Sequence, residues 1–347
     1  MASRGTRVLV AILFVAMLLP SGAVLAADIS WNTTAASNDW ADTDNWSSGT
    51  IPTYSDALTF TTSNYTAVLN RDTFVSTITF AANAADFSFS HGGTGPGGGT
   101  MFFSGGILVN GGSQTFNAAV RANGKTFSVL NNGTGKLDFN SAFMSNNDKD
   151  VTATIGGSGN IEFRKLSRRS DAYDMEVIKT GTGTVYILEE FTTPATASEG
   201  AITGTMTINE GTLNIVGEGC LGVGPAAFNA AQLTLNGGTL QAARSFTIDD
   251  ANRGITIGAS GGTFDVGSGL TLTIANPIAG SGALRKTGDG ALALAGIGLA
   301  TTAIEVDEGA MTIADGLTVG DVRIGFDGGE ASLAVTAGNV AMGTASD

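Results

Sequence analysis

The stretch MTINEGTLNI, residues 206–215, recurs as LTLNGGTLQA at 233–242 and as IEVDEGAMTI at 304–313. Each copy has two alternating apolar side chains, a short turn with Asn or Asp and Gly, and two more alternating apolar side chains. Alternation places apolar side chains on one face of a strand because the strand period is two residues. Asn, Asp and Gly tolerate the left-handed backbone of a sharp turn. The unit is therefore read as strand, turn, strand.

Such a turn also closes antiparallel hairpins, so the spacing of the copies decides the fold. Asn209 and Asn236 lie 27 residues apart, with further strand-like segments between the copies. Weaker copies occur at 107–116, where Gln114 replaces an apolar residue, and at 255–266. This period favours coils of two or three short strands that stack on their neighbours. We predict an all-β parallel β-helix, rather than a sandwich or meander, with roughly a dozen coils in a rod roughly 60 Å long.

The composition supports a folded, strand-rich chain. Of 347 residues 50 are glycine, 42% are hydrophobic and 14% are charged, against about 25% charged in an average protein. Disordered chains show the reverse, low hydrophobicity with high charge. The net charge of −14 disfavours nucleic acid and anionic lipid as partners. The single cysteine, Cys220, has no partner for an internal disulfide and is expected to be a small buried hydrophobe.

The N-terminus has the pattern of a secretory signal peptide, residues 1–26. Arg4 and Arg7 precede an apolar run at 8–19, and small residues lead to a cleavage site after Ala26. The run is shorter than the roughly 20 residues of a membrane span. We therefore predict export to the extracellular space or the bacterial cell surface, with no transmembrane helix in the mature chain.

All three tryptophans, Trp31, Trp40 and Trp46, fall within residues 27–71. A solenoid needs an end unit that differs from its repeats, so this segment is predicted to be an N-terminal β cap, with the repeats running over 72–347. The alternative is that exposed indole rings, spaced among Asn and Asp, stack on sugar rings. The three tryptophans are accordingly candidate ligand-binding residues.

A second unusual segment, residues 162–177, interrupts the low-charge pattern of the repeats. It is expected to be a loop or short helix that bulges from one coil, where solenoids often carry function. Arg164, Arg168 and Arg169 are its candidate ligand-binding residues. The alternative is a solvated run of charges that pair with one another.

The stretch GSGALRKTGDGALALAG, residues 280–296, begins almost like the phosphate-binding loop G-x-x-x-x-G-K-[ST]. Arg285 stands where that loop requires glycine, and a turn and strand follow in place of the helix that a phosphate site uses. Nucleotide binding is therefore excluded. Lys286 and Arg285 are expected on or near the solvated surface, with the alternating leucines in the interior.

The same stretch resembles the autotransporter-associated β-strand repeat, whose usual form is G-S-G-x-L-x-K-x-G-x-G-x-L-x-L-x-G. A split second copy occupies 157–161 and 179–187. The resemblance implies a right-handed β-helix in a passenger region, exported to the bacterial outer surface for display and not for catalysis. The matching residues are Gly280, Ser281, Gly282, Leu284, Lys286, Gly288, Gly290, Leu292, Leu294 and Gly296.

No catalytic constellation stands out in the sequence. The only histidine, His91, lies in a glycine-rich stretch without a nucleophile motif. No spaced His, Cys and Glu cluster indicates a metal, and no cofactor is expected. The least unfavourable cluster for a polysaccharide lyase or hydrolase is Asp249, Asp250 and Arg253.

These observations predict a non-catalytic secreted or cell-surface β-helix that acts as a stalk or adhesin. The alternative is a carbohydrate-binding or polysaccharide-degrading β-helix. Expected partners are extracellular glycans, another surface protein, or a second copy that joins end to end through open strand edges.

Overall fold

The structure is a computed structural model that describes residues 28–32, 37–61, 65–92, 99–145, 150–169, 173–191, 200–296, 299–314, 317–325, 329–336 and 340–342. The predicted signal peptide lies outside these ranges. Of the helical segments within them, none has the length and apolar character needed to cross a lipid bilayer.

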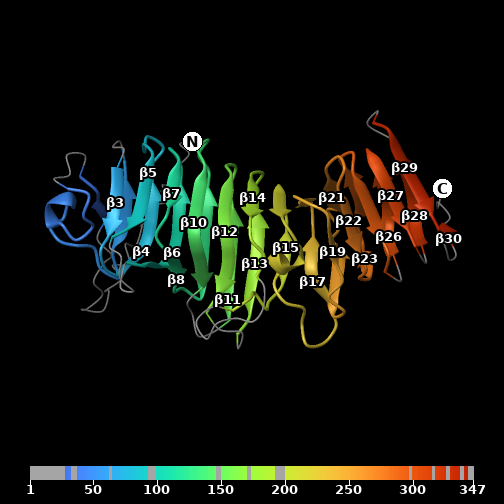
Figure 1. Cartoon of the computed structure of the whole chain (residues 1–347), viewed down its shortest axis with the longest axis horizontal. Helices are drawn as coiled ribbons and strands as arrows, with labels where there is room; N and C mark the ends of the chain where they lie inside the picture. Colours follow the sequence, from blue (N-terminus) through green and yellow to red (C-terminus); the bar gives the residue numbers. More distant parts are fainter. Residues whose placement is uncertain are drawn as a thin grey trace, which may run out of the picture.

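The chain forms a parallel β-solenoid of about 11 turns, which confirms the predicted fold class. Figure 1 shows the rod, with the strands stacked side by side along its long axis in chain order. The strands of successive turns form three ladders, the third of which is interrupted in the middle of the rod, and every pairing between named strands described here is parallel. The right hand of the coil stays a prediction of the resemblance.

The first ladder runs through the whole rod. Its strands are β1 (Asp28–Ser30), β2 (Ala57–Phe60), the ends of β4 (Thr73–Phe80) and β6 (Met101–Val109), β9 (Thr126–Asn131), β11 (Val151–Gly156), β13 (Met175–Thr180), β15 (Met206–Ile208), β17 (Asn229–Leu235), β20 (Arg253–Ile257), β23 (Ile278–Gly280), the starts of β26 (Leu299–Val306) and β28 (Leu317–Ile324), and β30 (Val340–Met342).

The second ladder lies beside it. Its strands are β3 (Tyr65–Leu69), β5 (Phe87–His91), β7 (Gln114–Phe116), the starts of β10 (Leu137–Ser145) and β12 (Ile161–Arg168), β14 (Thr184–Ile187), β16 (Thr212–Ile215), β18 (Thr239–Ala242), β21 (Gly262–Val266), β24 (Ala283–Thr287), and the ends of β26 and β28.

The third ladder has two parts. The first consists of the starts of β4 and β6, β8 (Val120–Ala122), and the ends of β10 and β12. The second consists of β19 (Phe246–Ile248), β22 (Thr271–Ile274), β25 (Ala291–Leu294), β27 (Gly309–Ile313) and β29 (Ala331–Val335). Within the described ranges the short 3-10 helices are η1 (Thr43–Asn45) and η2 (Glu218–Leu221), which lie outside the ladders.

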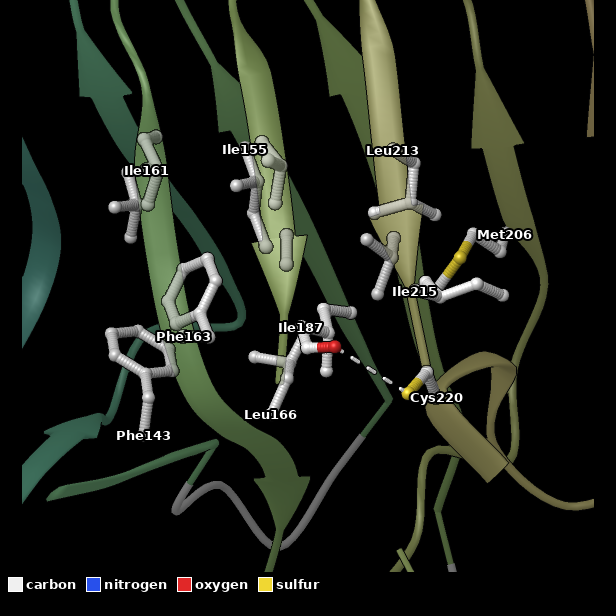
Figure 2. Packing of buried hydrophobic residues seen from close by; sticks show 14 of the residues in the cluster. Phe143, Ile155, Ile161, Phe163, Leu166, Ile187, Met206, Leu213, Ile215 and Cys220 are labelled. Atoms are coloured by element: carbon white, nitrogen blue, oxygen red, sulfur yellow. Dashed lines mark hydrogen bonds between the residues drawn. The ribbon is translucent and has the colours of Figure 1, made fainter. Parts of the chain in front are cut away.

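The interior consists of columns in which equivalent side chains of successive coils touch. In the second ladder Phe89, Phe116, Phe139 and Phe163 form one such column, with ring centroids 4.6, 5.1 and 4.9 Å apart. All four rings are buried. Stacked rings add to the roughly 25 cal/mol per Å² gained from apolar burial. Figure 2 shows the interior further along, where aliphatic side chains from several strands meet Phe143 and Phe163.

Glycines let consecutive turns approach one another. Gly211 and Gly309, each the last residue of an Asn/Asp-Glu-Gly turn, have φ of +62° and +68°. A Cβ at Gly211 would lie 2.5 Å from the carbonyl oxygens of Gly181 and Gly183 in the preceding coil. The turn chemistry predicted from the repeat is therefore used both for backbone conformation and for close stacking.

The expectation that Lys286 lies at the surface is wrong. Lys286 is fully buried, opposite Phe264 and Val306 in the second ladder. Its ammonium group donates to the carbonyl oxygens of Thr287 at 2.7 Å, Gly288, and Glu308 in the next coil at 3.3 Å. Three carbonyl acceptors stabilise an ammonium group inside the rod because they replace its water.

Lys179 repeats this arrangement in the first ladder, opposite Ile155 and Ile208. Its ammonium group donates to the carbonyls of Thr180 (2.9 Å), Gly181 (2.7 Å) and, in the next coil, Glu210 (3.0 Å). Both lysines begin a Lys-Thr-Gly sequence. The lysine of this sequence therefore joins its own turn to the turn of the following coil.

Arg285, in contrast, lies at the surface and pairs with Asp307 in the next coil. The leucines of the same stretch, Leu284, Leu292 and Leu294, lie in the interior. The stretch that resembles a phosphate loop is thus two strands, β24 and β25, and the turn between them.

The segment 162–177 is not a bulging loop or short helix over most of its described length. Glu162 to Arg168 belong to β12, and Met175 to Val177 belong to β13, which pairs with β11 and β15. Residues 170–172 lie outside the described ranges. Except for the buried Arg168, the described charges of this segment stand on ordinary strands or at their ends with their side chains at least partly exposed, because strand alternation leaves every second position facing away from the core.

Candidate functional site

The third ladder is interrupted in the middle of the rod. Between Ile187 and Asn229 the described residues form β15, β16 and η2, and none of them continues this ladder. We call this interruption of the third ladder the third-face gap, and the described residues of the chain that span it are 188–191 and 200–228. Two hollows open there, of about 690 and 640 Å³, and both are lined by Val223 and Gly224.

Arg253, at the start of β20, binds two acidic residues that line the larger hollow, Glu218 and Asp250. Its buried guanidinium donates to Glu218 Oε1 and Asp250 Oδ2, both at 3.0 Å. It also donates to the carbonyls of Leu221 at 3.3 Å and Gly222 at 2.8 Å. The guanidinium therefore ties η2 to the following coil.

The Glu218 carboxylate is held from both sides. The backbone N–H groups of Asp249 and Asp250 donate to its two oxygens at 3.0 and 3.2 Å, beside the bond from Arg253. Burial raises the pKa of Glu218, while these hydrogen bonds and Arg253 oppose the rise. A carboxylate with its oxygens engaged in this way stabilises the fold and is poorly placed to take a proton from a substrate.

The rest of the larger hollow is also held by internal contacts. Glu190 pairs with Arg244 at 2.6 Å, and the ammonium of Lys165 lies 4.6 Å from the ring centroid of Phe191. Figure 2 shows Cys220 on η2 beside Ile187, whose carbonyl accepts from the thiol at 3.7 Å. Cys220 is buried, and burial raises the pKa of its thiol to about 11.

The structure thus brings the candidate cluster Asp249, Asp250 and Arg253 together. Its contacts with Glu218 hold η2 against the following coil. The smaller hollow is lined by Asp150, Asp174 and Glu176 among others. In the described ranges, no three His, Cys, Asp or Glu side chains come together in a way that could hold a metal ion. The gap therefore offers a concave surface, and Glu190, Glu218 and Asp250 at its larger hollow are engaged in internal ion pairs.

The three tryptophans lie inside the first coils, and the expectation that their rings stack on sugars is wrong. Trp31, Trp40 and Trp46 are 3%, 1% and 2% exposed. Trp46 contacts the other two at centroid distances of 4.8 and 4.6 Å, and its indole N–H donates to the carbonyl of Trp40. The rings cover the end of the core, because three large apolar side chains are more stable packed there than in water.

The three candidate arginines have different surroundings. Arg164 is exposed and pairs with Glu189 of the next coil at 2.8 Å. Arg168 is buried and donates to the Thr203 hydroxyl at 3.3 Å. Arg169 is exposed. Arg168 is therefore unavailable to a surface ligand.

Sequence reasoning missed an aromatic column made of Tyr54, Phe74 and Phe102, in which Tyr54 and Phe74 are exposed and Phe102 is buried. Phe74 and Phe102 stand opposite each other on β4 and β6, with centroids 4.5 Å apart, and Tyr54 follows at 6.2 Å from Phe74. Tyr54 is 52% and Phe74 38% exposed. No sequence signal identified it: alternation counted from the buried Ile78 and Phe80 would place Phe74 inside, and the register shift between Val75 and Thr77 turns its ring outward.

Comparison with known proteins finds one distant similarity. The chain is 30% identical over 198 residues to a protein of Brucella suis biovar 1 (strain 1330) described as "Adhesin BmaC autotransporter". The aligned part is 57% of this chain and 4% of the length of that protein. No protein-family model matches the sequence. No solved structure matches the chain.

Proposed function

We propose that the chain is part of an exported, cell-surface passenger of autotransporter type, and that it acts as an adhesin or as the stalk that presents one. The observation that carries this proposal is a parallel β-solenoid whose sequence is similar to an autotransporter adhesin. The signal-like residues 1–26 and the repeat signature at 280–296 support it. The repeat type is part of the proposal.

The role we propose is not catalytic. Three acidic groups that line the larger hollow support this, because Glu218 and Asp250 are bound to Arg253 and Glu190 is paired with Arg244. A rod of stacked coils presents a long surface to a partner with little structural change.

The location is tested on intact cells of the source organism. Antibodies raised against the purified chain are expected to label unpermeabilised cells, and external protease is expected to remove the label. A chain found only inside the cell, or only in the medium with none attached to cells, would refute the proposal.

Adhesion is tested with beads coated with the purified chain. Coated beads are expected to bind surfaces or cells that the organism colonises, and beads coated with heat-denatured chain are not. Equal binding of the two bead preparations would mean that the fold has no part in adhesion.

A further inference from the structure

The aromatic column borders a pocket at the N-terminal end of the rod. The pocket has a volume of about 430 Å³ and lies between the loop that carries Tyr54 and the turn before β4. Ile51, Pro52, Tyr54 and Phe74 supply its apolar lining. This volume is in the range of small-molecule sites and fits one ring-sized group with its substituents.

The walls of the pocket are held in place before any ligand arrives. The Thr53 N–H and hydroxyl donate to the Asp56 carboxylate at 2.7 and 2.8 Å, and the Asp56 carbonyl accepts from Ser76 of β4. On the other side Asp72 accepts from the Thr100 N–H at 3.0 Å. A pre-organised pocket binds more tightly because less conformational entropy is lost on binding.

One face of the column is open to a ligand. Phe102 covers Phe74 at 4.5 Å and 13°, and Arg121 lies 5.7 Å above the Phe102 ring. On the pocket side Tyr54 is tilted 36° from Phe74 and is half exposed. The column thus ends in an aromatic surface that a flat apolar face of a ligand can cover.

The polar edge of the pocket indicates the class of ligand. Arg71 and Asp72 line the same pocket, are both exposed, and carry opposite charges. A hydroxyl group both donates and accepts hydrogen bonds, so neighbouring hydroxyls fit a carboxylate and a guanidinium together. An apolar side chain of a protein partner would displace water from both charges without replacing those hydrogen bonds.

We propose that this pocket binds one neutral pyranose ring of an extracellular glycan. The apolar face of the sugar lies on Tyr54, and its hydroxyls contact Asp72 and Arg71. The proposal rests on the proposed adhesin function and names the ligand class of that function. The alternative reading of the sequence placed a sugar site at the tryptophans, and the proposal places it at the exposed rings of Tyr54 and Phe74.

Binding is tested with the purified full chain on an array of immobilised neutral and acidic oligosaccharides, followed by titration calorimetry with the strongest neutral binder. Tyr54→Ala is expected to weaken binding about tenfold, a typical loss for an aromatic contact at the centre of a site. Tyr54→Phe keeps the ring and is expected to stay within about threefold of wild type. Asp72→Asn keeps an acceptor for Thr100 and is expected to weaken binding about threefold.

Phe228→Ala is the matched control, because Phe228 is 55% exposed and lies outside the pocket lining. It is expected to bind as wild type, and thermal unfolding shows whether each variant keeps the wild-type fold. Absence of neutral-glycan binding by wild type, or equal binding by folded Tyr54→Ala, overturns the proposal.

The bead assay separates this proposal from the proposed function. Periodate oxidation of the target surface destroys vicinal diols of sugars and is expected to abolish bead binding, as is Tyr54→Ala. Beads that still adhere after both changes overturn the glycan pocket and leave the adhesin proposal in place. Wild-type beads that never adhere, despite glycan binding on the array, overturn the adhesin proposal alone.

Discussion

Replacing Gly211 by alanine tests the close approach of consecutive turns, on which stacking of the coils depends. At Gly211, with φ of +62°, a Cβ would lie 2.5 Å from two carbonyl oxygens and 2.8 Å from Lys179 Nζ. Gly269 is the matched control, because its φ is +74° and a Cβ there would meet no atom within 4 Å. The two substitutions share the backbone strain and differ in the coil-to-coil contact.

The magnitudes follow from these two effects. Alanine in the left-handed region costs about 1–2 kcal/mol, and loss of glycine from the unfolded chain returns about 0.4–1 kcal/mol. Gly269→Ala is therefore expected to lower the unfolding free energy by about 1 kcal/mol. At Gly211 the neighbouring backbone must also move, which adds about 1–3 kcal/mol. We expect Gly211→Ala to lose about 3 kcal/mol in total.

The assay is urea unfolding of the full chain, followed by far-ultraviolet circular dichroism, with hydrogen exchange as a local readout. Since each coil contacts only its neighbours, faster exchange in Gly211→Ala is expected to concentrate in β13 to β16. Equal losses of stability for the two variants would refute the argument, because backbone strain alone would then account for both.

Three further predictions concern buried groups. Lys286→Met leaves three carbonyls without their donor and is expected to lower the unfolding free energy by about 3 kcal/mol. The control is Lys125→Met at an exposed lysine, which is expected to change the unfolding free energy by less than about 0.5 kcal/mol, and equal urea midpoints for the two variants would contradict this account. Burial lowers the pKa of Lys179 to about 8 from 10.5, so the unfolded chain binds more protons between these values. The unfolding free energy of wild type relative to Lys179→Met should therefore rise with pH over that window, and a fall would show that burial does not dominate. Cys220, whose thiol pKa is raised to about 11, is expected to resist iodoacetamide at pH 8 until urea unfolds the rod; rapid alkylation of the native chain, followed by mass spectrometry, would contradict its burial.

The candidate site was only partly predictable from sequence. Asp249, Asp250 and Arg253 were grouped correctly, but their binding to Glu218 depends on η2, which lies some 30 residues earlier in the chain. Alternation within one strand predicts which side chains face the core. It does not predict which residues of the neighbouring coil those side chains contact. For the same reason Arg164 could be recognised as charged, but its pairing with Glu189 could not.

The aromatic residues likewise show what the sequence reveals and what depends on the tertiary structure. Tryptophans are conspicuous in a sequence, but whether a ring lies inside or outside depends on the coil that covers it. Trp46 is covered by Trp31, Trp40 and Phe60, whereas Tyr54 has its one described ring contact with Phe74 and is half exposed.

The sequence by itself determined the repeating coil, because alternation and turn glycines are local properties of each ten-residue unit. It also determined that residues 280–296 form strands and a turn, since Arg285 and the glycines after Lys286 do not suit a phosphate loop. Only the tertiary structure decided that Lys286 lies inside. Its ammonium group becomes stable there because carbonyls of two stacked turns, one of them a full coil later, surround it.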